Sequence, residues 1–189
     1  AALGEAVWGC TKSVKNSIYI TVGTGVGVGV IIGGKPYHGM IHPEGGHIFV
    51  HRRPDDPMAK GICPYHGNCL EGLASGPAIE RRWGRKGAEL SDCLAVWELE
   101  AFYIGQAICT YICTLSPERI VVGGGVMHQE QMLPMIRQEV RRQMHGYIQG
   151  KGMDKLEEYI VPVSLGDNQG VMGGVKLAMD AYIEEGGTL

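Results

Sequence analysis

The pattern of apolar and polar positions divides the chain into short strands and longer helices. Two runs rich in β-branched residues, Ser17–Val22 and Val26–Ile32, are separated only by Gly23-Thr24-Gly25, which predicts a tight hairpin. Two shorter apolar runs, at residues 119–122 and 159–163, predict buried strands. Helical periodicity predicts helices over residues 1–12, 94–115, 131–149 and 170–183. Residues 70–84 are predicted to form short helices broken at Gly76-Pro77.

The predicted helices differ in how much of their surface is apolar. The segment 94–115 is apolar on most sides, so we expect it to lie in the core or in an interface. The segment 131–149 carries a single apolar stripe, formed by Met132, Ile136, Val140 and Met144. Residues 37–70 show little periodicity. Strands that alternate with helices behind a hairpin predict an α/β fold with a mixed sheet.

Composition narrows the class of protein. The chain has 189 residues, of which 44% are hydrophobic and 20% charged, as in an ordinary soluble globular domain. A net charge of −3 argues against a basic face that binds nucleic acid. No apolar run approaches the length of a membrane span, so we expect no membrane partner. Six cysteines are too few for a disulfide scaffold, and we therefore expect a reducing, cytoplasmic setting.

The first candidate motif is the glycine-rich sequence between Val22 and Val30. Glycines let a backbone approach phosphate oxygens, and Thr24 adds a hydroxyl donor at the tip of the hairpin. Close packing of a glycine-rich hairpin without a ligand explains the pattern equally well. The motif is not a Walker A loop, because no Gly-Lys-Ser/Thr follows, and it is not a Rossmann fingerprint, because a strand follows it.

A second motif combines thiols with imidazoles. Cys63, His66 and Cys69 are spaced three residues apart, and His47 precedes them. Two thiolates and two imidazoles form a tetrahedral set suited to a structural zinc ion, with no open coordination position for catalysis. His51 competes with His47 for the fourth place. The alternative to any metal is a pair of buried free cysteines with surface histidines.

Two further segments carry candidate binding chemistry. Pro43–His47 and Glu71 offer carboxylates and an imidazole for hydrogen bonds to vicinal sugar hydroxyls, although surface charge accounts for the carboxylates equally well. Three glycines, Gly123–Gly125, follow a buried strand, and α/β folds hold nucleotides at such carboxyl-terminal strand ends. A simple turn from a strand to a helix would rarely need three glycines.

Together these residues resemble the ROK family of sugar kinases and repressors. The resemblance covers nearly the whole chain, and it is carried by Gly25-Val26-Gly27, Gly46-His47, Cys69-Leu70-Glu71-Gly72, Ala74-Ser75-Gly76-Pro77 and Gly123-Gly124-Gly125-Val126. Family members commonly carry Cys-x-Cys-Gly followed by Gly-Cys, whereas this chain has Cys63-Pro64-Tyr65-His66 and Cys69. This departure, with the longer gap after His47, is similar to the bacterial fructokinase branch.

The resemblance implies an actin-like, ribonuclease-H-like ATPase fold in two lobes. Residues 1–189 would form the C-terminal lobe, with a zinc-binding loop at about residues 42–72. It implies ATP, Mg²⁺ and a structural Zn²⁺, a hexose substrate with fructose favoured, and a homodimer. The implied site residues are Thr24 on a phosphate beside Gly23 and Gly25; Pro77, Gly123, Gly124, Gly125, Val126 and Met127 around the nucleotide; Glu44, His47 and Glu71 facing the sugar; and His47, Cys63, His66 and Cys69 on zinc.

The family pattern also has parts that this sequence does not match. Family members carry an Asp-x-Gly-Gly-Thr phosphate loop, and an Asp-x-Asn segment with the general-base aspartate precedes an Ala-Ala-x-Gly-Glu helix. The sequence starts at Ala1-Ala2-Leu3-Gly4-Glu5, so we expect the base just before Ala1. We expect a fragment without the N-terminal lobe and with little or no turnover alone. No catalytic residue is assigned, since Asp55, Asp56 and Asp167 match no family motif.

The predicted function is ATP-dependent phosphorylation of a hexose, fructose to fructose 6-phosphate, by positioning and Mg²⁺-assisted charge stabilisation. One alternative is a sugar-sensing repressor of the same family, with a helix-turn-helix ahead of residue 1, although the zinc loop argues against it. Another is a glucokinase or mannokinase, because sequence alone does not resolve the hydroxyl geometry of the sugar. A third is a zinc-stabilised scaffold with a degenerate pocket, which would show no thermal shift with sugar or nucleotide.

Overall fold

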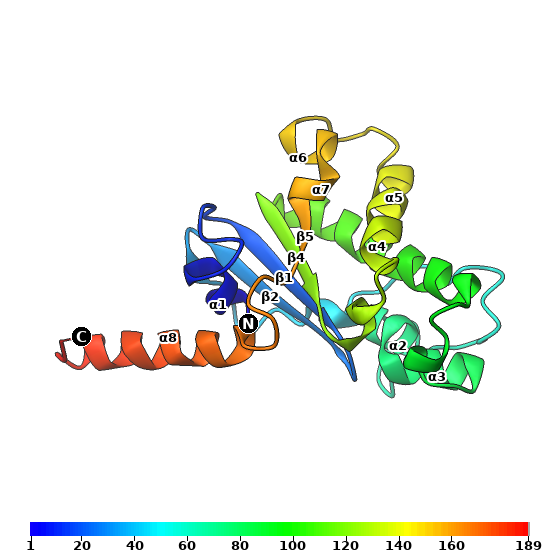
Figure 1. Cartoon of the computed structure of the whole chain (residues 1–189), viewed down its shortest axis with the longest axis horizontal. Coiled ribbons are helices and arrows are strands. Elements are labelled where there is room, and N and C mark those ends of the chain that lie inside the picture. Colours follow the sequence, from blue (N-terminus) through cyan, green and yellow to red (C-terminus); the bar gives the residue numbers. More distant parts are fainter. Residues whose placement is uncertain (189) are drawn as a thin grey trace.

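The computed structural model describes residues 1–188, and Leu189, the last residue of the chain, lies outside the described part. At its centre is a five-stranded sheet with the strand order β3-β2-β1-β4-β5 (Figure 1). The strands are β1 (Ser17–Val22), β2 (Val26–Ile32), β3 (Lys35–Pro36), β4 (Arg119–Gly123) and β5 (Ile160–Pro162). Because some neighbours run parallel and others antiparallel, the mixed sheet predicted from the sequence is confirmed.

The central strand β1 pairs with its two neighbours in opposite senses. With β2 it forms an antiparallel hairpin in which Val22 lies opposite Val26. With β4 it pairs in parallel, and Thr21 lies opposite Gly123. Both β1 and β4 are buried along nearly their whole length, which explains their continuous apolar sequences. As a result, the hairpin turn and the glycines that follow β4 lie at the same edge of the sheet.

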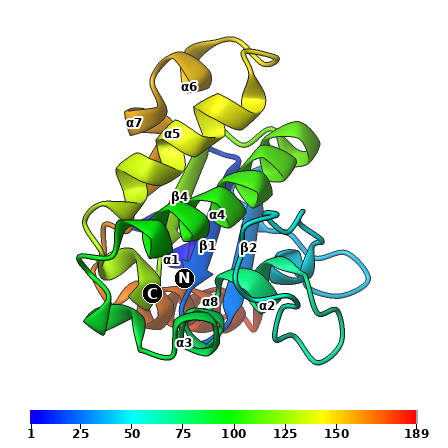
Figure 2. The ribbon, with the colours of Figure 1, turned by 90° about the vertical axis from the view of Figure 1, so that its right-hand side faces the viewer.

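Helices cover both faces of the sheet (Figures 1 and 2). On one face α4 (Leu94–Leu115) packs against α5 (Met132–Met144), and on the other α1 (Ala2–Val7) packs against α8 (Gln169–Glu184). From there α8 projects away from the body of the molecule (Figure 1). The remaining helices are α2 (Leu70–Ala74), α3 (Gly76–Trp83), α6 (Lys151–Asp154), α7 (Leu156–Tyr159) and the 3-10 helices η1 (Gly45–His47), η2 (Gly87–Glu89) and η3 (Gly125–His128).

Helix α4 forms much of the hydrophobic core. Its side chains Trp97, Tyr103, Ile104 and Ile108 are buried, so its apolar surface belongs to the core of this chain. The stripe predicted on α5 is buried as well, through Met132, Ile136, Val140 and Met144. Among the residues that the structure describes, no helix combines the length and apolar character that crossing a membrane requires.

Three predicted boundaries were wrong by a few residues. The helix predicted over residues 131–149 ends at Met144, because His145 adopts a positive φ of 47°. The strand predicted from residue 159 begins one residue later, since Tyr159 closes α7 and its hydroxyl donates to the Pro117 carbonyl. The first helix ends at residue 7 rather than at residue 12. Beyond it the chain turns back, and the Thr11 amide donates to the Glu5 carbonyl of α1.

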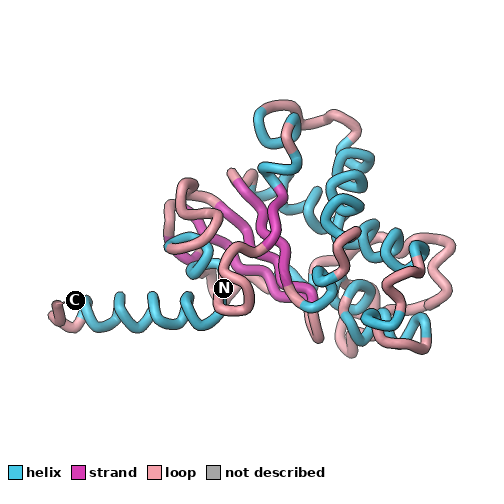
Figure 3. Tube along the Cα trace, viewed as in Figure 1, coloured by secondary structure: helices cyan, strands magenta, loops and turns pink. Residues whose placement is uncertain are grey.

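A long loop, residues 37–69, joins β3 to α2 (Figure 3). A buried ionic cluster ties it to the helices. Arg82 Nε donates to Asp56 Oδ1 of the loop (2.8 Å), and Arg82 Nη1 donates to Glu100 Oε1 (3.1 Å). The Tyr103 hydroxyl donates to Asp56 Oδ2 (2.6 Å). Burial raises the pKa of Glu100 to about 8, because desolvation and the Asp56 charge outweigh the attraction of Arg82.

We expect Glu100→Gln to change how stability depends on pH. The folded chain binds the Glu100 proton more tightly than the unfolded chain does. This contribution to the free energy of unfolding is complete below the ordinary carboxyl pKa of about 4.3 and is lost as the pH rises through about 8. Glutamine resembles the protonated acid and does not titrate. Urea unfolding at pH 6 to 9 should therefore show the variant gaining stability relative to the wild type as the pH rises, and a constant difference would contradict this assignment.

Candidate functional site

Four side chains of the long loop and its junction with α2 converge on one point. His47, Cys63, His66 and Cys69 each place one donor atom within 4.8 Å of the others. His47 Nδ1 lies 3.8 Å from Cys63 Sγ and 3.5 Å from Cys69 Sγ, and His66 Nδ1 lies 3.7 Å from Cys63 Sγ. Bond lengths of about 2.3 Å to sulfur and about 2.0 Å to nitrogen separate such ligands by about 3.6 Å around a tetrahedral zinc ion. The four donors therefore fit a zinc site.

The structure separates His47 from its competitor, His51. His51 is exposed, and its backbone amide and carbonyl are bonded to the side chain of Gln106 (3.0 and 2.9 Å). It is not part of the four-donor group. His47 closes η1, whose first carbonyl, that of Gly45, accepts from the Tyr111 hydroxyl (2.8 Å). Geometry thus favours the set that contains His47.

Backbone amides donate hydrogen bonds to both thiols of this group. Cys69 caps the start of α2, where the Gly72 amide donates to its Sγ (3.4 Å), and the His66 amide donates to Cys63 Sγ (3.5 Å). Burial raises the pKa of Cys69 to about 11. At Cys63 burial also acts to raise the pKa, but amide donors from His66 and Tyr65 outweigh it and the pKa is lowered. The amide donors therefore favour the thiolate form of Cys63.

The second ring nitrogen of His47 faces Glu71. His47 Nε2 lies 3.8 Å from Glu71 Oε1, and Glu71 Oε2 accepts from the Val26 amide (3.0 Å) at the start of β2. The two side chains are 27% and 29% exposed, so a ligand can reach both. A Cβ on Gly25 would lie 2.7 Å from Glu71 Oε2, so a side chain there would displace the carboxylate. The carboxylate thus links the imidazole to the hairpin.

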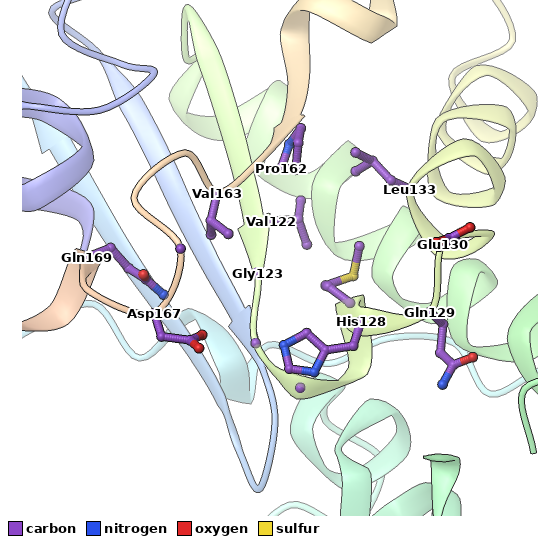
Figure 4. Close-up of a pocket in the computed structure, with 14 residues that line it drawn as sticks. Val122, Gly123, His128, Gln129, Glu130, Leu133, Pro162, Val163, Asp167 and Gln169 are labelled. Carbon is purple, nitrogen blue, oxygen red and sulfur yellow. The ribbon is translucent and has the colours of Figure 1, made fainter. Parts of the chain in front are cut away.

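Gly123–Gly125, named here the glycine edge, line a hollow of about 410 Å³ at the end of β4. Its other wall comes from the connection between β5 and α8, within residues 162–169 (Figure 4). Gly124 adopts a φ of 93°, and a Cβ there would lie 2.5 Å from the Val22 carbonyl oxygen, so this position requires glycine. We call this space the glycine-edge hollow.

Two further hollows meet at the hairpin turn. The Trp97 hollow, of about 370 Å³, is lined by Trp97, Gly76 and Gly125, together with Gly23 and Thr24. The Glu71 hollow, of about 350 Å³, is lined by Glu71 and by the same two turn residues. The turn therefore stands between the glycine edge and the Glu71 side chain. The Gly76 amide, at the start of α3, donates to the Gly23 carbonyl (2.7 Å) and holds the turn in place.

Most of the residues predicted for the site lie around these hollows. Gly23, Thr24, Gly25 and Glu71 meet at the turn, and Gly123, Gly124, Gly125, Val126 and Met127 line the two hollows on the other side. Pro77 lies in the first turn of α3, next to Gly76 but outside the lining of the three hollows. Glu44 is exposed just before η1. Ligand contacts by these residues stay predictions.

Sequence reasoning missed three residues that the fold brings to the hollows. Trp97 is buried, with its Nε1 donating to the Leu90 carbonyl (2.9 Å), and it forms part of the Trp97 hollow. The sequence carries no signal that separates Trp97 from the other apolar residues of this helix. His128 and Asp167 lie on opposite sides of the glycine-edge hollow (Figure 4). The turn sequence Gly166-Asp167-Asn168 before the last helix was the available signal for Asp167.

Comparison with known proteins defines the class to which this fold and site belong. The model of the ROK family matches residues 1–181, and the chain belongs to the ROK family. The resemblance inferred from the motifs is thereby confirmed, and so is the actin-like ATPase fold that it implied. Assignment of these residues to a C-terminal lobe stays a prediction.

Individual relatives and one solved structure agree with this membership. A protein of Bacillus subtilis (strain 168) is 50% identical over 186 residues, which make up 98% of this chain and 62% of that protein. A fructokinase of Zymomonas mobilis subsp. mobilis is 46% identical over 183 residues, 96% of this chain and 60% of that enzyme. The crystal structure of a ROK family glucokinase from Streptomyces griseus in complex with glucose and AMPPNP is 26% identical, with a TM-score of 0.74 over 93% of this chain and 64% of that one. The chain spans about 60% of the length of the curated relatives it matches.

We expect the purified chain to retain zinc, and His47→Ala to lose it. His47 Nδ1 lies close to both cysteines, so its removal leaves three donors and an open position. His51→Ala is the matched control, since His51 is exposed and outside the four-donor group. Zinc content measured by mass spectrometry of the metal after dialysis should fall only in the first variant. Equal zinc in both variants, or equal loss, would contradict the site.

Proposed function

We propose that the protein transfers a phosphoryl group from ATP to a hexose, with fructose preferred and fructose 6-phosphate as the product. The observation that carries this proposal is the position of Thr24, which lines both the Trp97 hollow and the Glu71 hollow. A nucleotide at the glycine edge and a sugar beside Glu71 would meet at this turn. Membership of the ROK family and similarity to a fructokinase along nearly the whole chain support the same reaction.

On the sugar side, Glu71 and His47 supply a complementary pair of polar groups. Glu71 Oε1 accepts a hydrogen bond from one hydroxyl, and His47 Nε2–H donates to its neighbour. Glu44, in the same loop, is assigned to an outer hydroxyl. Zinc bound by His47, Cys63, His66 and Cys69 would have four protein ligands and no open position, so its role is structural. With Nδ1 turned to the metal, His47 keeps its proton on Nε2 for the sugar.

On the nucleotide side, the Thr24 hydroxyl donates to a phosphate oxygen, with Gly23 and Gly25 allowing close approach. Residues 123–127 and Pro77 are assigned to the nucleoside, against the flat surface that the glycine edge provides. Mg²⁺ accompanies ATP and neutralises charge that develops on the phosphates. We assign no Mg²⁺ ligand to the described residues. The homodimer implied by the resemblance and the cytoplasmic setting stay predictions.

The described residues include no aspartate that we assign as general base. Asp55 is exposed and pairs with Arg53 Nε (2.7 Å). Asp56 is buried, and both of its carboxylate oxygens accept hydrogen bonds, from Arg82 and Tyr103 among others. Asp167 lines the glycine-edge hollow rather than the hollow that contains Glu71. These positions support the choice not to assign Asp55, Asp56 or Asp167 as the base, which stays a prediction.

A panel of hexoses tests the proposed reaction. We expect the full-length protein to form ADP and a sugar 6-phosphate, with kcat/KM for fructose higher than for glucose or mannose by about tenfold or more, because hydroxyl recognition discriminates strongly. A coupled assay for ADP, with the sugar phosphate identified by chromatography, measures both. Preference for glucose or mannose would contradict the fructose assignment, and absence of phosphorylation of any hexose would contradict the kinase.

Thr24→Val tests the phosphate contact. We expect KM for ATP to rise and kcat/KM for ATP to fall about 10- to 100-fold, since a hydrogen bond to a charged group contributes about 1.5–3 kcal/mol. KM for fructose should stay near the wild-type value. Thr114→Val is the control, because Thr114 is exposed on α4 and its hydroxyl donates only to the Thr110 carbonyl (2.7 Å). An unchanged KM for ATP in Thr24→Val would overturn the assigned contact.

A further inference from the structure

Glu5 is a fully buried carboxylate to which the proposed reaction assigns no role. It lies in α1, and five donors meet its two oxygens. Glu5 Oε1 accepts from the amides of Ser164 (2.8 Å) and Leu165 (3.2 Å). Glu5 Oε2 accepts from the Ser164 hydroxyl (2.5 Å), the Cys10 amide (2.9 Å) and the Cys10 thiol (3.3 Å). One side chain therefore joins α1 to a loop 159 residues further along the chain.

Hydrogen-bond donors rather than a cation hold the charge of Glu5 among the described residues. Burial acts to raise the pKa of a carboxyl group. The pKa of Glu5 is nevertheless lowered, because the donors of Ser164 and Cys10 outweigh the desolvation. The group is thus an ionised carboxylate with charge-assisted hydrogen bonds, which are stronger than neutral ones. These bonds set the position of the backbone at residues 164 and 165.

The backbone that Glu5 holds is the outer wall of the glycine-edge hollow. Ser164 and Leu165 belong to the connection between β5 and α8. Five residues from the end of β5 to the start of α8 line the hollow opposite the glycine edge (Figure 4): Pro162, Val163, Gly166, Asp167 and Gln169. The wall comes close to the glycines, since a Cβ on Gly123 would lie 2.4 Å from Val163 Cγ1. Ser164 and Leu165 do not line the hollow themselves, so Glu5 acts from behind the wall.

We propose that Glu5 is a positioning residue for nucleotide binding: through Ser164 and Leu165 it fixes the wall that faces Gly123–Gly125. Glu5 does not line the hollow, so it touches neither nucleotide nor sugar and is not a catalytic residue. The inference rests on the proposed function in one respect, which is that the glycine-edge hollow receives the nucleotide. Loss of the carboxylate should therefore weaken nucleotide binding while the sugar and zinc sites stay intact.

Glu118, the residue before β4, provides a control carboxylate. Its Oε2 accepts from the amides of Lys15 and Asn16 (2.9 Å each) and from Asn16 Nδ2 (3.2 Å), so it also joins a distant loop through one carboxylate. It precedes β4, at the end of that strand opposite to Gly123, and lines none of the three hollows. Glu118 is exposed, and Glu118→Gln perturbs hydrogen bonds between distant segments without touching the wall.

The test measures binding of AMPPNP with Mg²⁺ to the full-length protein by titration calorimetry. In Glu5→Gln the amide group keeps one acceptor oxygen and gains an NH₂ that cannot accept, so at least one set of donors is left without a partner. We expect the Kd for AMPPNP to rise about tenfold in Glu5→Gln and about threefold in Ser164→Ala. The Kd for fructose and the zinc content should stay within about twofold of wild type. Glu118→Gln should bind AMPPNP as the wild type does.

Amide hydrogen exchange separates positioning from a general loss of stability. Positioning predicts faster exchange at residues 164–169 in Glu5→Gln, with wild-type protection in β1 and β4. Faster exchange throughout, with fructose and AMPPNP weakened together, would overturn the inference. Unchanged AMPPNP affinity in Glu5→Gln would overturn it too, while leaving the proposed function in place. A wild-type protein that does not bind AMPPNP would overturn both. If Glu5→Gln does not fold, Ser164→Ala decides by the same criteria.

Discussion

The parallel pairing of β1 with β4 is the constraint on which the site depends. It sets Thr21 opposite Gly123, so that the turn after β1 and the glycines after β4 come together at one edge of the sheet. The approach is close, since a Cβ on Gly23 would lie 3.9 Å from the Gly125 amide nitrogen. A slip of one residue would move every side chain of a strand to the opposite face and would separate the two glycine-rich segments. The arrangement of the three hollows around the hairpin turn and the glycine edge therefore depends on this register.

The long loop between β3 and α2 needs a second constraint, because η1 is its single helix or strand among the described residues. Two groups of side chains help to anchor it at two places. At one, Asp56 is buried against Arg82 and Tyr103. At the other, the side chains of the two cysteines and two histidines lie close together. His47 of this group faces Glu71, which accepts a hydrogen bond from the hairpin. A loop fixed at both places holds polar groups in a stable geometry, as a binding site requires.

What the sequence allowed us to predict was local. The hairpin followed from two β-rich runs around Gly23-Thr24-Gly25, and three of the four thiol and imidazole donors are spaced three residues apart. Contacts between distant segments had no such signal. Glu71 bonds to an amide 45 residues away, and Glu5 to one 159 residues away, and neither glutamate lies in a pattern that names its partner. The buried contact between Arg82 and Glu100 was equally invisible, because an ionisable side chain is ordinarily exposed unless a partner is present.

The claim that nucleotide and sugar meet at the Thr24 turn is tested most directly by a crystal structure of the full-length protein with zinc, fructose and AMPPNP. We expect a phosphate oxygen within about 3 Å of the Thr24 hydroxyl, the nucleoside along Gly123–Gly125, and fructose hydroxyls bonded to Glu71 and to His47 Nε2. A nucleotide that binds away from the glycine edge, or a fructose that binds away from Glu71, would contradict this arrangement.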